Sequence, residues 1–108
     1  FGNEGFQVFQ NYPNPVADQT TITLYIPEID KVSITMTDIL GRRIIQTERM
    51  LERGKHTFRL NPGGENIYFF IANWKGHSSG IKIHQAGFHS NRVAVLEYIG
   101  NDAYSPHG

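Results

Sequence analysis

The chain has 108 residues, with ten basic and ten acidic side chains and a formal net charge of zero at pH 7. That length fits one domain with one hydrophobic core, and the balanced charge excludes the strong positive field by which nucleic-acid-binding domains attract their ligand. The absence of cysteine excludes disulfides, thiol catalysis and thiolate metal ligands, and no apolar run reaches the ~20 residues of a membrane-spanning helix.

The first third of the chain predicts an edge strand, a proline-rich turn and two further strands. Residues 1–5 are interpreted as a linker remnant and residues 6–9 as a short edge strand. The run Tyr-Pro-Asn-Pro, which begins at Tyr12, cannot be helical, because each proline disfavours helix at its own position and at the one before. Apolar and polar side chains then alternate along residues 20–26 and 31–37, which predicts antiparallel strands with one face toward a core.

The middle of the chain predicts a series of hairpins. Asp38 and Gly41 take the first and fourth positions of a predicted type I turn, which favours an aspartate and a left-handed glycine there. Further strands are predicted at residues 44–48, 55–60, 66–74 and 81–84. Turn signals about every ten residues, without helical periodicity, predict an all-β fold, an Ig-like antiparallel β-sandwich of about seven strands over residues 6–100. The predicted core consists of inward positions on these strands: Ile22, Leu24, Val32, Ile34, Met36, Phe58, Leu60, Tyr68 and Phe70.

The C-terminal segment is too apolar for a plain linker. Residues 92–99 include Val93, Val95 and Tyr98, and a free segment of this composition would be prone to aggregate through β-pairing. We therefore expect residues 92–99 to form one extra strand packed on the sandwich. Residues 101–108 are interpreted as a linker to a following domain.

Both faces of the strand at residues 66–74 are apolar. The alternation that turns Tyr68 and Phe70 inward turns Phe69 and Ile71 outward. An apolar outer face on an antiparallel sheet calls for a cover. The C-terminal segment, a neighbouring domain or a partner could supply that cover.

No group of residues in the sequence predicts catalysis. Asp38 has no acid or histidine nominated beside it to form an acid–base pair. The spacing of His77, His84 and His89 does not place two imidazoles on one strand face beside a carboxylate. We therefore expect no catalytic residue, no metal and no cofactor. The predicted interaction surface combines aromatic and outward apolar side chains with the basic pair after the turn: Phe69, Ile71, Trp74, Arg42 and Arg43.

Several pieces of the chain, in this order, are similar to those of one family. They are the Tyr-Pro-Asn-Pro run with residues 20–24 behind it, the sequence Asp-Ile-Leu-Gly-Arg from Asp38, the apolar run from Ile67 and the last short strand from Ile81. Over residues 11–85 the chain resembles the type A-like C-terminal sorting domain of cargo of the type IX (Por) secretion system. The resemblance implies an Ig-like sandwich without catalytic function. It also implies an exported protein of Bacteroidetes, at the cell surface, associated with the outer membrane, or extracellular.

Three functions are compatible with this resemblance. Because the chain continues beyond the last resembling strand, the first interpretation is an internal copy that acts as a structural, interaction or display module of an exported multidomain protein. A genuine sorting signal, read by the secretion and attachment machinery, is one alternative. A carbohydrate-binding or adhesin module that uses Trp74 is the other. The expected partners are accordingly neighbouring domains, that machinery or a glycan, and no nucleic acid.

Overall fold

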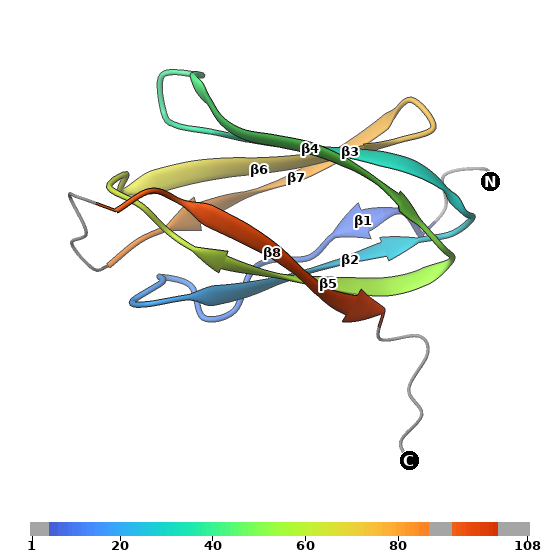
Figure 1. The fold of residues 1–108 in the computed structure, drawn as a ribbon, viewed down its shortest axis with the longest axis horizontal. Helices are drawn as coiled ribbons and strands as arrows, with labels where there is room; N and C mark the ends of the chain where they lie inside the picture. The colour runs from blue at the N-terminus through green and yellow to red at the C-terminus, as the bar shows by residue number, and fades with distance from the viewer. Residues whose placement is uncertain (1–4, 87–91, 102–108) are drawn as a thin grey trace, which may run out of the picture.

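Two four-stranded antiparallel sheets pack face to face in the computed structural model of this protein (Figure 1), which describes residues 5–86 and 92–101. The eight strands are β1 (Gln7–Val8), β2 (Thr20–Ile26), β3 (Asp30–Thr37), β4 (Arg43–Leu51), β5 (Gly54–Asn61), β6 (Ile67–Trp74), β7 (His77–His84) and β8 (Val95–Asn101). The first sheet has the order β1-β2-β5-β8 and the second sheet β4-β3-β6-β7. The described residues contain no helix, and hence none that could cross a membrane. The predicted all-β Ig-like sandwich is confirmed, with the extra C-terminal strand as its eighth.

The core lies between the two sheets, because alternate side chains of each strand point to the same side. All nine predicted core side chains are buried, none more than 2% exposed. The ring centroids of Phe58 on β5 and Phe70 on β6 lie 6.5 Å apart, which brings the inner faces of the two sheets into contact. The core also contains the buried side chains of Val8, Val16, Ile26, Leu51, Ala72, Trp74, Ile83 and Ala94.

The turn between β6 and β7 is shorter than predicted. Lys75 and Gly76 alone connect the paired residues Trp74 and His77, and both have positive φ, 48° and 80°. A two-residue turn with left-handed backbone at both positions matches the twist of the flanking strands. The sequence predicted a link over residues 75–80, whereas β7 already begins at His77.

The Tyr-Pro-Asn-Pro run crosses one end of the sandwich and ties the two sheets together. On the first sheet, the Asn11 side-chain amide donates a hydrogen bond of 3.0 Å to the hydroxyl of Thr20, where β2 begins. On the second sheet, the main-chain amide of His84, at the end of β7, donates to the Asn14 side-chain oxygen at 3.1 Å. The amide of Val16 donates in turn to the carbonyl of His84 at 2.7 Å. This loop is therefore part of the folded domain.

β8 runs along the edge of β5 in the first sheet (Figure 1). The register places Leu96 opposite Leu60 and Tyr98 opposite Phe58, and both β8 side chains pack against the core. The prediction of an extra ordered strand is confirmed. Of the two predicted linkers, residues 1–5 and 101–108, the described part includes only Gly5 and Asn101, and Asn101 ends β8.

Of the three possible covers for the outer face of β6, the structure excludes β8 of the C-terminal segment. β8 belongs to the first sheet, whereas Phe69 and Ile71 lie on the second. The physical reason is backbone hydrogen bonding. The edge of β5 offers unpaired amide and carbonyl groups, and the outer face of a sheet offers none.

Candidate functional site

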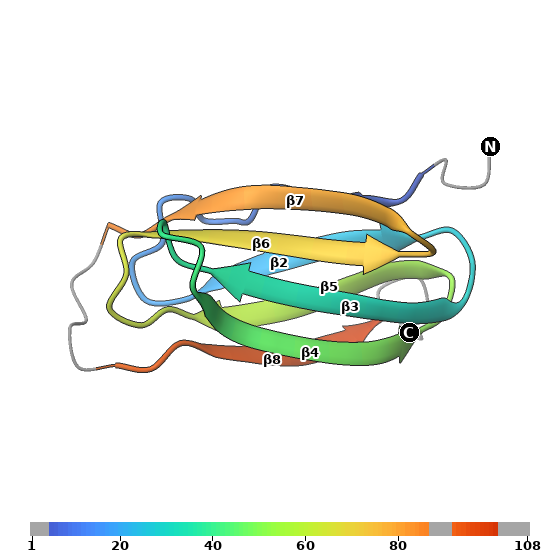
Figure 2. The ribbon, with the colours of Figure 1, turned by 90° about the horizontal axis from the view of Figure 1, so that it is seen from above.

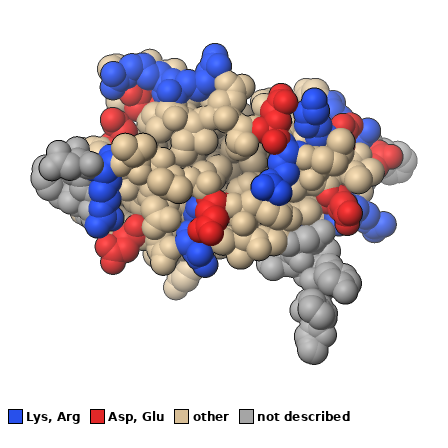
Figure 3. All heavy atoms as spheres, in the orientation of Figure 1, with Lys and Arg blue, Asp and Glu red and all other residues tan. Residues whose placement is uncertain are grey.

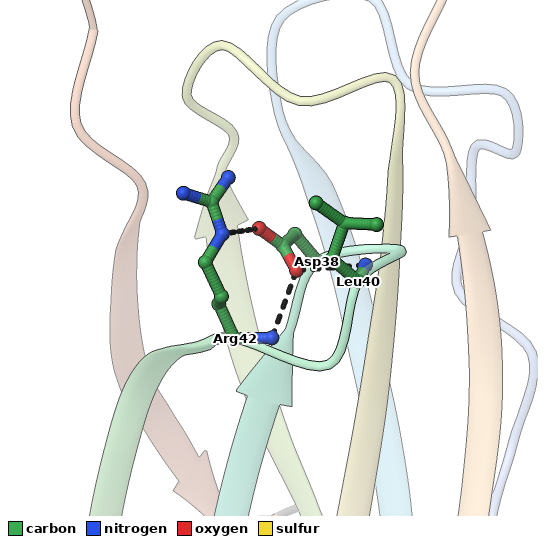
Figure 4. Close-up of polar contacts among 3 residues, drawn as sticks. All are labelled: Asp38, Leu40 and Arg42. Atoms are coloured by element: carbon green, nitrogen blue, oxygen red, sulfur yellow. Dashed lines mark hydrogen bonds and ion pairs between the residues drawn. The ribbon is translucent and has the colours of Figure 1, made fainter.

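The turn between β3 and β4 is held by one buried carboxylate, as Figure 4 shows. One oxygen of Asp38 accepts hydrogen bonds from the main-chain amides of Leu40 and Arg42, both at 2.9 Å, and the other accepts from Arg42 Nε at 2.7 Å. The Gly41 amide donates to the Asp38 carbonyl at 3.0 Å, and Gly41 has the left-handed φ of 85° that the turn requires. The predicted role of Asp38 as a turn residue is therefore confirmed.

The electrostatics of Asp38 favour its charged form. Burial acts to raise the pKa of this carboxyl group, which is only 2% exposed. The hydrogen bonds from the amide and guanidinium of Arg42 and from the amide of Leu40 act in the opposite direction. Together they outweigh the burial, and the pKa of Asp38 lies below its usual value. The charged carboxylate thus keeps the turn in one conformation at neutral pH.

This turn projects two large apolar side chains into solvent. Ile39 is 64% exposed and Leu40 is 77% exposed. The hydrogen bonds of Asp38 nevertheless hold the turn that carries them. Beside the tip lies a pocket of about 200 Å³, lined by Ile39, Glu65, Asn66 and Ile67. Exposed apolar groups on a rigid support are typical of protein-binding surfaces, because they lose little conformational entropy on binding.

The loop between β5 and β6, on the other side of the pocket, is also held by hydrogen bonds. The hydroxyl of Tyr68 accepts hydrogen bonds from the amides of Gly63 at 2.7 Å and Glu65 at 3.3 Å. The Gln85 side-chain amide donates to the carbonyls of the same two residues. Both walls of the pocket are thus set by buried polar groups.

The outer face of the second sheet, toward which Figure 2 looks, carries the outward side chains of β6. Ile71 is 37% exposed, and Ile67 and Phe69 are half-buried. Ile71 pairs with Gly80 on β7, and a Cβ atom at Gly80 would lie 3.1 Å from Ile71 Cγ1. The glycine therefore leaves room for the isoleucine side chain. We call Ile67, Phe69, Ile71, Arg43 and Lys82 the outer patch.

Basic side chains gather over the hairpin of β3 and β4, at the upper left of Figure 3. Arg42 forms the ion pair with Asp38, whereas Arg43 donates to the side-chain oxygen of Gln46. Within the described part of the chain, neither Arg43 nor Lys82 has an acidic partner. The other ion pairs there join Lys31 to Glu48, Arg59 to Glu97, and Lys75 to Glu28 and Asp30.

Trp74 was predicted to be part of the interaction surface, but the structure places it in the core. Its side chain is 0% exposed, its indole N–H donates to the carbonyl of Glu28 at 2.8 Å, and its ring centroid lies 5.4 Å from that of Phe6. The same alternation that buries Tyr68 and Phe70 also turns Trp74 inward, so the sequence contained this signal. A buried indole cannot stack on a sugar ring, and the carbohydrate-binding site built on Trp74 is therefore incorrect.

The described histidines form no metal site, and one of them has a structural role in the core. Among the described residues no three histidine, aspartate or glutamate side chains are grouped as a metal site, and His89 lies outside those residues. His56, which the sequence reasoning missed, is buried. Its Nε2 hydrogen-bonds the carbonyl of Glu52 at 2.6 Å, and its Nδ1 hydrogen-bonds the hydroxyl of Tyr98 at 2.9 Å. Its position two residues before Phe58 on the inward face of β5 was the available signal.

Comparison with known proteins gives one match. A family model described as the secretion system C-terminal sorting domain matches residues 10–84, more than half of the chain. The resemblance found over residues 11–85 agrees with this range to one residue at each end. No curated protein and no solved structure matches the chain.

Proposed function

The chain belongs to the Por secretion system C-terminal sorting domain family, and from this premise we propose that it is a sorting signal that directs the protein carrying it out of the cell. The family implies a secreted or cell-surface protein and an interaction with the secretion machinery. The observation that carries the proposal is the family match over residues 10–84, which includes strands β2 to β7.

The geometry supports recognition of a folded domain by protein–protein contact. The family's features occupy one end of the sandwich: the Tyr-Pro-Asn-Pro run, the Asp38 turn and the start of β6 lie where β2 begins and β7 ends. Their polar side chains hold loops in place, and the apolar tip of Ile39 and Leu40 is left for contact. Such a rigid, exposed end suits recognition by shape after folding.

Export of a reporter tests this proposal. A fluorescent protein with residues 1–108 fused to its C-terminus would be expressed in a bacterium that has this secretion system, and in the same strain with the system deleted. We expect fluorescence at the cell surface or in the medium only in the intact strain. The reporter without the module is the control. Equal export with and without the module would refute the proposal.

A second function is favoured by one observation. β8 lies outside the matched residues and yet completes the first sheet, as expected of a structural, interaction or display module within a longer exported protein. The same experiment separates the two functions. A display module would fold, and would protect β8 amides from hydrogen exchange, without exporting the reporter.

A further inference from the structure

The central strands of the two sheets differ in the polarity of their outer faces. The first sheet turns Thr21 and Thr23 outward on β2 and Arg59 on β5, where Arg59 pairs with Glu97, and its exposed apolar side chains, Val95 and Ile99, lie on the edge strand β8. The second sheet turns Ile67, Phe69 and Ile71 outward on a single strand, β6. Because the strands of an antiparallel sandwich normally present polar side chains to water, the apolar row on β6 indicates a contact surface.

The strand register places Phe69, the middle residue of this apolar row, between two cations. Phe69 lies opposite Thr37 on one side and opposite Lys82 on the other, and Thr37 lies opposite Arg43. All four side chains are on the outer face, because directly paired residues share a face. The row across the sheet is therefore Arg43, Thr37, Phe69 and Lys82, with the phenyl ring between the two positive charges.

The acidic groups near this row are few. Glu48 lies on the same face, opposite Ser33, and forms an ion pair with Lys31. Glu65 lines the pocket beyond the start of β6. Neither forms an ion pair with Arg43 or Lys82 within the described part of the chain, and both cations are exposed. The outer patch therefore combines an apolar centre with a positive rim.

We propose that the outer patch binds an extended protein segment that is both acidic and apolar, a partner chemistry that deepens the proposed sorting function and rests on it. Carboxylates of the segment would contact Arg43 and Lys82, and its apolar side chains would pack on Phe69 and Ile71. An anionic polysaccharide suits the patch less well. Among the described outward residues of the second sheet, Phe69 is the only phenylalanine, tyrosine or tryptophan, and isoleucine side chains do not stack on sugar rings.

A defined peptide tests this surface in solution. The probe is a fluorescent peptide of alternating glutamate and leucine, and the matched control peptide has lysine in place of glutamate. Titration of the full chain, followed by fluorescence anisotropy, should give saturable binding of the acidic peptide. The basic peptide should bind at least about tenfold more weakly, because like charges meet across the interface. Binding of the acidic peptide should weaken as salt is raised.

Substitutions test whether the acidic peptide binds at the outer patch. The double variant R43E/K82E should weaken binding of the acidic peptide about tenfold or more, and Phe69→Ser should weaken it about fivefold. The controls lie on the first sheet: Lys55→Glu reverses an exposed charge there, and Tyr25→Ser removes an outward aromatic ring. Both controls should bind as the unmodified chain does. Thermal melting of every variant confirms that it is folded.

Three results would overturn the proposal. One is the absence of saturable binding by the acidic peptide. Another is equal binding by alginate, with R43E/K82E impaired and Phe69→Ser unaffected, which would indicate a polyanion site. The third is export of the reporter by R43E/K82E as efficiently as by the unmodified module. In that case the sorting function stands and the docking surface fails. If the unmodified module exports nothing, the sorting function fails, and the peptide titration still decides the docking surface.

Discussion

Both sheets contribute to the core, yet their outer faces and their relation to the family match differ. β2 and β5 of the first sheet meet β3 and β6 of the second through side chains that are almost fully buried. Outside, the first sheet is polar along β2 and β5, whereas the second is apolar along β6. Burial in the domain's own core explains Phe70 but not Phe69. The difference between these neighbouring residues is the basis of the docking surface proposed for the second sheet.

The family match divides the sheets in another way. All four strands of the second sheet lie within residues 10–84, whereas both edge strands of the first sheet, β1 and β8, lie outside that range. The family match thus covers only β2 and β5 of the first sheet.

The largest effect on stability is expected from Phe70→Ala in the core, and its neighbour on the outer face, Phe69, gives the comparison. Phe70→Ala should lower the free energy of unfolding by about 3–5 kcal/mol, because it leaves a cavity against Phe58. Phe69→Ala should change it by less than about 1 kcal/mol, since its side chain faces outward. Urea denaturation measures both. Equal losses would mean that the outer face is packed as tightly as the core.

Removal of β8 should have the next largest effect. Truncation after Gln85 removes the packing of Leu96 and Tyr98 and leaves the Nδ1 of His56 without its partner. The expected loss is about 2 kcal/mol or more, on the scale of one or two buried side chains and a hydrogen bond. Thermal melting and hydrogen exchange along β5 would measure it. An unchanged melting temperature would show that the first sheet does not depend on β8.

Asp38→Asn should destabilise the chain in a pH-dependent manner. The pKa of Asp38 is lowered from 3.8 in the folded state, so its stabilisation is fully present above the unfolded pKa and is lost as pH falls through the folded pKa. The difference in melting temperature between the unmodified chain and the variant should therefore shrink in acid. Asp18→Asn, which alters an exposed carboxylate outside this turn, is the control. A difference that is constant with pH would contradict this role.

The smallest effect is expected for an ion pair at the surface of the second sheet. Glu48→Gln removes the contact with Lys31, in which the nitrogen and oxygen are 3.8 Å apart and both side chains are more than half exposed. The free energy of unfolding should change by less than about 0.5 kcal/mol. Urea denaturation at low salt would detect a larger value, which would mean that this rim of the outer face stabilises the fold.

Local patterns determined much of this protein from the sequence alone. The alternation along β2 and β3 identified which side chains face the core, because successive residues of a strand point to opposite sides. Asp38 and Gly41 identified their turn, because its hydrogen bonds join residues close in the chain. The order of the family's short motifs identified the fold and the family.

Only the tertiary structure decided which distant strands are neighbours. The sequence predicted that the C-terminal segment is ordered, but the free edge of β5 decided that β8 joins the first sheet and does not cover the outer face of β6, where Phe69 is half-buried. The same register brings Arg43 and Lys82 to either side of Phe69. Pairing between strands depends on backbone hydrogen bonds and core packing across the whole domain, so no local sequence pattern predicts it.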